Sequence, residues 1–360
     1  MPKDTSKKQK FPAVAKKITG RDVARVAGVS AQVVSAVFGR QAGNTRFSEA
    51  AKARVLAAAE ELGFQPCMLG RSLRANRSFL VGVLDWDDHA WMTPSLLRGI
   101  QCGLREAGLT PLFLSQADEA EEAENLHALR RRQVDAFIVV PRQREPAYLE
   151  LKNSGIPVVE IFNNILAGDG IPHTCQDMTS VGYMATRHLI GLGHRDIALL
   201  THCRYRENWD ARDHWLGYCR ALAEAGLPER VVAHSLDRFV LGKVGSWHAC
   251  TAEVEEKMLG RKRPTAAVCY DCWHAVYLIE AAARRRLRMP EALSLVGYHD
   301  WDICETITPA ITTLEIDPLA MGHAAARQVV GLLTGRPVDN IQIPPRFIER
   351  TSTSQAPQVG

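Results

Sequence analysis

Short apolar runs alternate with longer amphipathic segments along the chain from Phe79 onward. The runs lie at residues 79–84, 111–114, 136–140, 156–161, 197–200, 266–269 and 293–298. Between them, segments such as Leu96–Ala107 and Val181–Leu192 carry apolar residues at helical spacing. Strands that alternate with helices build parallel sheets covered on both faces. The sequence therefore predicts an α/β body large enough for two such sheets.

The segment in front of this body differs from it in charge. Residues 1–77 hold fifteen Lys and Arg against five Asp and Glu, a balance of +10, whereas the remainder comes to −6. A basic segment on a mildly acidic body indicates a head that binds a polyanion. A solvated basic tail would explain only Lys3–Lys17, which leaves the patterned residues behind it unexplained.

Two short helices joined by a tight bend are predicted within this basic head. Thr19 can cap the first helix through the N–H of Asp22, and Gly28 allows the left-handed backbone that a sharp bend needs. Ser30 then caps a second helix over Ala31–Phe38. Apolar positions recur at steps of three and four residues, at Val23, Val26, Val29, Val33, Val34 and Val37.

A third helix is predicted from Ser48 as its cap to Gly63 as its stop. Its apolar stripe consists of Ala51, Val55, Ala58 and Leu62. Three helices of this size can close around the valines and leave the outer side of the second helix free to enter a major groove. The residues expected to face the bases are Ala31, Gln32, Ser35 and Ala36, of which Gln32 can pair with adenine.

The head carries long, ordered motifs. They read D-V-A-x-x-A-G-V-S-x-x-V-V-S from Asp22, then A-x-E-E-L-G-F-x-P, then R-S-L. In these motifs the chain resembles the lactose/galactose repressor family of transcription regulators. The resemblance implies an all-α helix-turn-helix head over residues 18–65, with Thr19 and Ser30 among its DNA-contacting residues.

The same resemblance implies a hinge helix over residues 66–77 that forms on DNA beside its twin from a second subunit. Leu73 occupies the position of the family's minor-groove wedge, and Arg71, Arg74 and Arg77 are expected phosphate contacts. Gly70 stands where the family commonly has alanine, which weakens this helix by roughly 0.5–1 kcal/mol. The loop 39–46 is also longer than is usual in the family.

The resemblance continues to about residue 355, through motifs such as Val134-Asp-Ala-Phe-Ile and Thr308-Pro-Ala-Ile-Thr-Thr-Leu. It implies a two-lobed, periplasmic-binding-protein-like (type I) body over 78–355, with parallel sheets. The expected first lobe comprises residues 78–161 and 317–340, and the second 162–316 and 341–355. The chain is thus expected to cross near Ile161, Asp317 and Asn340.

A ligand of such sheets lies at the carboxyl ends of the strands, here between the lobes. Residues just after each strand are therefore the effector-binding candidates. They are Asp85, Trp86, Asp87, Trp91, Phe162, Asn163, Arg204, Arg206, Asp271, Cys272, His299 and Asp300. Arg212 and His214 join them, because His214 stands where the family usually has a sugar-binding arginine.

The expected effector is a sugar acid such as gluconate, or a sugar-like metabolite. The stretch Gly297-Tyr-His-Asp-Trp-Asp-Ile, together with Val158-Val-Glu, resembles the gluconate-responsive branch of the family. A sugar acid needs a cation for its carboxylate, and Arg204, Arg206, Arg212 and His214 follow one strand closely. The aspartate usual after the strand at 266–269 is replaced by Cys272, with Asp271 one position early.

These observations predict a ligand-controlled regulator, expected to be a repressor, that binds a palindromic double-stranded DNA operator as a homodimer. The sequence does not distinguish a repressor from an activator, nor an inducer from a corepressor. We expect no enzyme activity, no cofactor and no metal. A nucleotide-dependent enzyme on a Rossmann-like sheet would need a glycine-rich phosphate loop after the first body strand, where Val81-Gly-Val-Leu-Asp stands instead. A solute-binding protein would leave the basic head unexplained.

The expected location is the cytoplasm, without a membrane partner. No apolar run approaches the eighteen or so residues of a membrane helix, and the lysine-rich start has no apolar export core. Nine cysteines, an odd number, indicate reduced thiols rather than a disulfide framework. The Cys269-Tyr-Asp-Cys272 spacing leaves a metal or redox role as an alternative to small core residues.

Overall fold

The computed structural model describes residues 18–38, 47–65, 72, 75–86, 93–141, 145–162, 164–202, 205–207, 209–234 and 252–358. The chain divides into two compact units, Met1–Ser78 and Phe79–Gly360. Within the described ranges, no helix combines the length and the apolar character that crossing a membrane requires.

The first unit is a three-helix head, with α1 at Gly20–Ala27, α2 at Ala31–Phe38 and α3 at Glu49–Leu62. Val23, Val34 and Val55 form the centre of its core, together with small alanines of α1 and α3. Val26, which the valine spacing placed with them, is instead 42% exposed. The other predicted valines are buried or packed against the core, so three short helices suffice to cover it.

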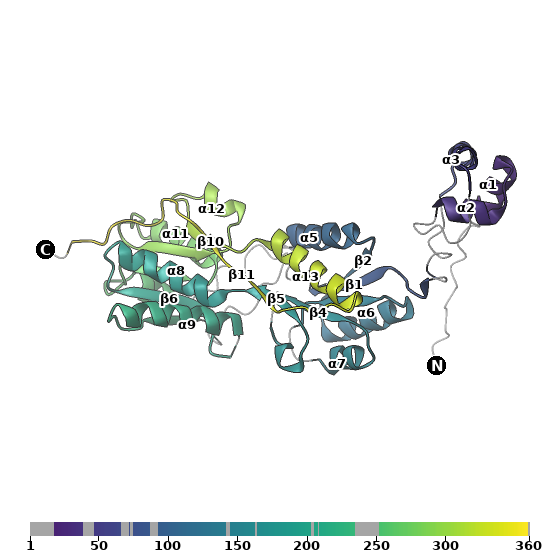
Figure 1. The fold of residues 1–360 in the computed structure, drawn as a ribbon. Coiled ribbons are helices and arrows are strands. Elements are labelled where there is room, and N and C mark those ends of the chain that lie inside the picture. Colours follow the sequence, from purple (N-terminus) through teal and green to yellow (C-terminus); the bar gives the residue numbers. More distant parts are fainter. Residues whose placement is uncertain are drawn as a thin grey trace, which may run out of the picture. The chain divides into compact units, whose positions relative to one another are not determined.

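The second unit contains two six-stranded sheets (Figure 1). The first has the order β11-β5-β4-β3-β1-β2, and all its strand pairs are parallel. Its strands are β1 (Leu80–Trp86), β2 (Thr110–Gln116), β3 (Ala136–Val139), β4 (Val158–Phe162), β5 (His173–Gln176) and β11 (Ile341–Ile343).

The second sheet has the order β12-β10-β9-β8-β6-β7 and is parallel apart from the edge pair β10–β12. Its strands are β6 (Ile197–His202), β7 (Val231–His234), β8 (Ala266–Cys269), β9 (Ser294–Tyr298), β10 (Thr312–Glu315) and β12 (Arg346–Ile348). Each sheet, with the helices that cover it, is one lobe of the body.

Helices lie against both lobes and follow the strands in the predicted alternation. They are α5 (Thr93–Glu106), α6 (Glu119–Arg131), α7 (Pro146–Asn153), α8 (Met178–Gly191), α9 (Trp209–Glu224), α10 (Ala252–Leu259), α11 (Cys272–Arg284), α12 (Asp302–Thr306) and α13 (Pro318–Leu333), with a 3-10 turn at Ala167–Asp169. α5 packs along α13, and α8 packs along α9 (Figure 1). Glycines permit these close contacts: a Cβ on Gly182 of α8 would lie 2.0 Å from the carbonyl oxygen of His214 in α9.

The crossings between the lobes differ from the expected ones at two of three points. β5 belongs to the first sheet, so the chain crosses after Gln176 and not near Ile161. β11 also belongs to the first sheet, so the return crossing falls between Ile343 and Arg346 and not near Asn340. The remaining crossing lies between Glu315 and Pro318, as expected. Strands β5 and β11 pair with each other in parallel, and that pairing extends the first sheet.

Candidate functional site

The position of α2 in the head is set by the turn that precedes it. Gly28 ends α1 with φ 64° and ψ 40°, the left-handed conformation predicted for it. The N–H of Val29 bonds to the carbonyl oxygen of Ala24 at 3.1 Å, and Ser30 Oγ accepts from the N–H of Val33 at 3.4 Å. At the start of α1, the Asp22 carboxylate accepts from both the backbone N–H and the hydroxyl of Thr19.

One face of α2 is turned inward and the other is open. Val34 is 3% exposed in the core, whereas Ala31 and Gln32 are exposed at the start of the helix. Ser35 and Ala36, one turn later, are half-buried. Thr19, which precedes α1, and Ser30, which precedes α2, are also exposed. The predicted base-facing side of α2 is therefore accessible in the isolated head.

α3 packs against both α1 and α2. Its Arg54 donates from Nε to the carbonyl oxygen of Ala27 at 3.1 Å, which satisfies the last turn of α1. Phe38 at the end of α2 meets Phe64 after α3, edge to face, at 5.6 Å between centroids. The predicted hinge contacts Arg71, Leu73 and Arg74 lie outside the described residues, as do Gly70 and the loop 39–46.

In the second lobe, polar side chains gather at the carboxyl ends of β8 and β9. The group comprises Asp210 and His214 of α9, Tyr270 and Asp271 after β8, and Tyr298 and His299 at the end of β9, and is called the strand-end cluster here. The Tyr270 hydroxyl donates to Asp210, and the rings of His214 and Tyr270 lie 5.9 Å apart. The rings of Tyr298 and His299 lie 3.9 Å apart.

Three buried polar atoms at this end of the second sheet have no hydrogen-bond partner among the described residues. They are Thr201 Oγ1 on β6, His214 Nδ1 on α9 and the Tyr298 hydroxyl on β9. A buried polar atom left without a partner costs about 1–3 kcal/mol. Three such atoms on neighbouring elements are what a hydrogen-bonding ligand would satisfy.

The cluster combines neutral imidazoles with a carboxylate. Burial lowers the pKa of His214 to about 3, an effect to which His274 adds and which Asp271 opposes. Burial also lowers the pKa of His299 to about 3, against the attraction of Asp271. Burial alone would raise the pKa of Asp271, but its bonds to His274, at 2.6 Å from Nδ1 and 2.9 Å from the backbone N–H, leave it below its ordinary value.

Two predicted effector residues adopt a backbone conformation that bulky residues rarely take. His299 has φ 69° and Phe162 has φ 79°, and each stands at the end of a strand, one in either lobe. Such conformations cost of order 1–3 kcal/mol and cluster at ligand sites. Both positions are strand ends that the sequence selected as candidates, and positive φ also occurs elsewhere, at Phe79, Gln133 and Arg286.

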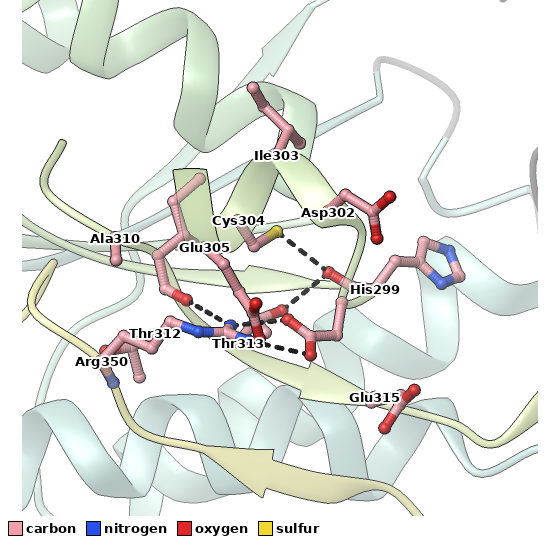
Figure 2. Close-up of polar contacts among 12 residues, drawn as sticks. His299, Asp302, Ile303, Cys304, Glu305, Ala310, Thr312, Thr313, Glu315 and Arg350 are labelled. Carbon is pink, nitrogen blue, oxygen red and sulfur yellow. Dashed lines mark hydrogen bonds and ion pairs between the residues drawn. The ribbon is translucent and has the colours of Figure 1, made fainter. Parts of the chain in front are cut away.

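Asp300, beside His299, is engaged elsewhere. Arg350 binds its carboxylate with both terminal nitrogens, at 2.6 and 3.0 Å, and also reaches Glu305 at 3.0 Å (Figure 2). The carbonyl oxygen of His299 accepts from the Thr313 hydroxyl at 2.9 Å and from Cys304 Sγ at 3.6 Å. In Figure 2 the imidazole of His299 points away from the Arg350 ion pair. These bonds hold the backbone of the turn after β9 and do not involve the imidazole ring of His299.

Two of the predicted cations, Arg206 and Arg212, make their described contacts outside the cluster. Arg206 is exposed and lies over the rings of Trp215, at 5.2 Å, and Tyr205. Arg212 is exposed and pairs with Asp213 at 3.3 Å. Arg204 lies outside the described residues, as do Asp87, Trp91 and Asn163.

Three further effector candidates, Trp86, Asp85 and Cys272, are buried and engaged in bonds or packing within their own lobe. Trp86 is 1% exposed and donates its indole N–H to the carbonyl oxygen of Val140 at 2.7 Å. Asp85 is buried and accepts from the N–H of Trp86 at 2.8 Å. Cys272, the first residue of α11, is buried in an apolar cluster behind Asp271. Among the described residues, no group of three or more His, Cys, Asp and Glu is arranged to hold a metal ion.

Sequence comparison matches both units to known families. Residues 19–67 match the model of bacterial regulatory proteins of the lacI family, and residues 186–353 match the periplasmic binding protein-like domain. In both units the chain is therefore similar to transcription regulators of the lacI family, which join a DNA-binding head to a periplasmic-binding-protein-like body.

Relatives within the lacI family align over nearly the whole chain. The transcriptional repressor PurR of Pectobacterium carotovorum subsp. carotovorum is 28% identical over 94% of this chain and 98% of its own. A lac repressor dimer bound to operator and the anti-inducer ONPF matches with a TM-score of 0.76 at 22% identity, over 94% of this chain and 100% of that one. A CelR–cellobiose complex matches with a TM-score of 0.65 at 21% identity, over the same shares.

Some residues in or beside the cluster were not predicted. Asp210, Tyr270 and Tyr298 of the cluster were missed, as were Thr201 and His274 next to it. Tyr298 and Thr201 lie within their strands, so the rule that selects residues after a strand passes over them. Asp210 and His274 lie in the first turns of α9 and α11, one turn beyond the residues that rule considers.

Proposed function

We propose that this chain is a lacI-family repressor that binds a near-palindromic operator as a homodimer and responds to a neutral polyhydroxylated effector in the second lobe. The open face of α2 is the observation that carries the DNA-binding part. Ala31 and Gln32 are exposed there, and Val34 anchors the opposite face. Two-fold symmetry of such heads requires two half-sites about one helical turn, or a multiple of it, apart.

Base reading in this proposal falls mainly on Gln32, since the alanines offer only methyl contact. Thr19, Ser30, Ser35 and Ala36 flank it as backbone or base contacts. The predicted hinge residues Arg71, Leu73 and Arg74 complete the contact set, with the leucine as minor-groove wedge. The +10 balance of residues 1–77 supplies the attraction to phosphate that all these contacts require.

The strand-end cluster carries the effector part of the proposal. Thr201, His214 and Tyr298 offer three buried hydrogen-bonding atoms that a ligand hydroxyl can satisfy. The sugar acid expected from the sequence finds less support, because the imidazole of His214 is neutral at physiological pH and Asp271 is a carboxylate. A neutral sugar avoids repulsion from that carboxylate and can donate to it.

Selection from sheared genomic DNA tests the DNA-binding part. The protein should enrich fragments with a near-palindromic site, and its affinity should fall with salt with a slope of about −0.9 per phosphate contacted. Gln32→Ala should weaken binding to the selected site by roughly 5- to 150-fold, the equivalent of about 1–3 kcal/mol. Glu60→Gln, at an exposed position of α3, is the control. Equal affinities for Q32A and wild type would remove Gln32 as the reader.

A thermal-shift panel of neutral mono- and disaccharides, nucleosides and gluconate-type acids tests the effector part. We expect a neutral sugar to raise the melting temperature and Thr201→Val to abolish that rise. A rise with gluconate and none with neutral sugars would restore the sugar-acid hypothesis. A solute-binding protein would show the ligand response without DNA binding, and an enzyme would consume the ligand.

A further inference from the structure

Arg350 lies on the C-terminal segment that follows β12, and its side chain is only 12% exposed. The residues after it bond to β9 and to the residues just before β10. The N–H of Thr351 donates to the carbonyl oxygen of Ala310 at 3.0 Å, and Ser352 Oγ donates to the carbonyl oxygen of Leu295 at 2.6 Å. Arg350 therefore starts from backbone that is held in place by the second sheet.

The guanidinium of Arg350 joins three separate pieces of the second lobe (Figure 2). It binds both carboxylate oxygens of Asp300, in the turn after β9, at 2.6 and 3.0 Å. It also donates to Glu305 of α12 at 3.0 Å and to the carbonyl oxygen of Ile311, just before β10, at 3.0 Å. A paired contact of this kind fixes orientation as well as distance, which the ammonium group of a lysine cannot do.

Asp300 stands between two aromatic residues of the same turn. His299 precedes it and Trp301 follows it, and their rings are stacked, with 5.5 Å between centroids and 5° between planes. The backbone of His299 is strained, at φ 69°. Such a conformation persists only where the surrounding structure holds it. The residue between the two rings is held by Arg350.

We propose that Arg350 is a positioning residue for the strand-end cluster, which fixes the strained turn and the direction of the His299 ring by holding Asp300. The two-nitrogen contact from a fixed segment to the residue between the rings carries this inference. Arg350 acts through the turn, since the imidazole of His299 points away from the ion pair in Figure 2. The consequence for an effector rests on the proposed function, whereas the effect on the turn does not.

Other bonds hold the start of the same turn. Thr313 Oγ1 donates to the carbonyl oxygen of His299 at 2.9 Å, and the N–H of His299 donates to the carbonyl oxygen of Leu314 at 2.9 Å. Neither bond reaches Asp300. The turn beyond His299 therefore depends on the contact that Arg350 makes.

Fluorine NMR of protein labelled with 5-fluorotryptophan tests the effect on the turn without any ligand. The chain has seven tryptophans, and Trp301→Phe assigns the signal of Trp301. Arg350→Lys keeps the positive charge and loses the paired contact, so it should move the Trp301 signal by more than its linewidth. The matched control is Arg346→Lys, because Arg346 pairs with Glu315 at 2.6 Å while most of its side chain is exposed. R346K should leave the signal in place.

Titration calorimetry with neutral sugars tests the consequence for binding, at a temperature at which wild type and both variants are folded. The probes are D-glucose, D-ribose and cellobiose. A sugar that binds wild type should bind R350K roughly tenfold more weakly, which corresponds to one lost hydrogen bond, and should bind R346K with unchanged affinity. An ion pair with a merely structural role would lower the melting temperature of R350K and leave its affinity for the sugar unchanged.

Failure of this proposal can be told apart from failure of the proposed function. An unmoved Trp301 signal in R350K, or a sugar affinity equal to that of wild type, would overturn the positioning role. If none of the sugars binds wild type, the neutral-sugar effector is wrong and the fluorine signal decides the role of Arg350. Should R350K not fold, Asp300→Asn offers the guanidinium one acceptor oxygen in place of two. D300N should then move the Trp301 signal, and an unmoved signal would be equally decisive against the proposal.

Discussion

The carboxyl ends of the two sheets, built on the same topology, differ in how their polar groups are satisfied. In the first lobe, the Trp86 indole is bound to Val140, and Glu160 accepts from the N–H groups of Ile165 and Leu166 at 2.7 and 2.9 Å. In the second lobe, Thr201, His214 and Tyr298 retain unsatisfied atoms within the described part of the chain.

The first sheet also has unsatisfied atoms, but they do not converge. They belong to Gln116 on β2 and to His173 and Gln176 on β5, and three strands separate β2 from β5. Those of the second sheet lie on β6, β9 and the helix α9, around β8. At equivalent ends of a repeated fold, polar groups are therefore satisfied locally in one lobe, whereas in the other converging atoms are left without a described partner.

The largest expected effect comes from the helix contact that seats His214. A methyl group at Gly182 would lie 2.0 Å from the His214 carbonyl oxygen, so Gly182→Ala should cost about 3 kcal/mol of folding free energy. Gly191→Ala, in the same helix and with no described atom within 4 Å of its Cβ, should instead stabilise by about 0.5–1 kcal/mol. Chemical denaturation measures both changes. Equal effects would show that α8 and α9 can separate without cost.

The buried imidazole makes the second lobe sensitive to acid. The folded-state pKa of His214, about 3, lies below its ordinary 6.5. Between these two pH values the unfolded chain binds a proton at His214 and the folded chain does not. Stability should fall as pH drops from 6.5, by about 2.5 kcal/mol at pH 4.5 from this residue. His214→Gln should reduce the acid-induced loss of stability by that amount and leave the part that His299 contributes, whereas His127→Gln, at an exposed position of α6, should leave the whole loss unchanged. Urea denaturation at each pH measures it, and parallel profiles for H214Q and wild type would contradict it.

The sequence predicted the head almost to the residue because its signals are local. Ser48, Gly28 and Gly63 each act on the backbone beside them, and the end of α1 and both bounds of α3 follow from them. The exposure of Val26 was not predictable from spacing, because two apolar stripes compete on α1 and only packing selects one.

The lobe boundaries and the cluster were harder to predict because they depend on long-range pairing. β5 and β11 were placed in the wrong lobe, since nothing near residues 173 or 341 reveals that they pair with each other. His299 and Phe162 were selected because a strand end is visible in the sequence. Tyr298 was missed because a tyrosine at the end of an apolar strand is expected to be a core residue. Only the structure shows that its hydroxyl has no described hydrogen-bond partner.

A buried acid gives the first lobe the opposite pH response. Burial raises the pKa of Glu160 to about 7, although the N–H groups of Leu166 and Ile165 oppose the rise. The folded chain therefore keeps a proton that the unfolded chain loses near pH 4.5. This stabilisation is complete below pH 4.5 and is lost as pH rises through 7.

Between pH 5 and pH 7, wild type should lose about 2 kcal/mol from Glu160. Glu160→Gln should abolish this loss in the same denaturation series. Glu150→Gln, at an exposed position of α7, is the control. If E160Q and wild type lost the same stability at every pH in this range, Glu160 would be ionised in the folded protein.

The smallest expected change in stability comes from removing single tyrosine hydroxyls, one with hydrogen-bond partners and one without a described partner. Tyr298→Phe removes a hydroxyl without a described partner and should stabilise the ligand-free protein by about 1 kcal/mol. Tyr218→Phe removes a hydroxyl that donates to Ile197 at 2.8 Å and accepts from the N–H of Arg230 at 2.9 Å, so it should destabilise by a similar amount. In the presence of a neutral sugar that stabilises wild type, Y298F should lose at least part of the ligand-induced shift and Y218F should keep it. A destabilised Y298F would mean that its hydroxyl already has a partner and does not await a ligand.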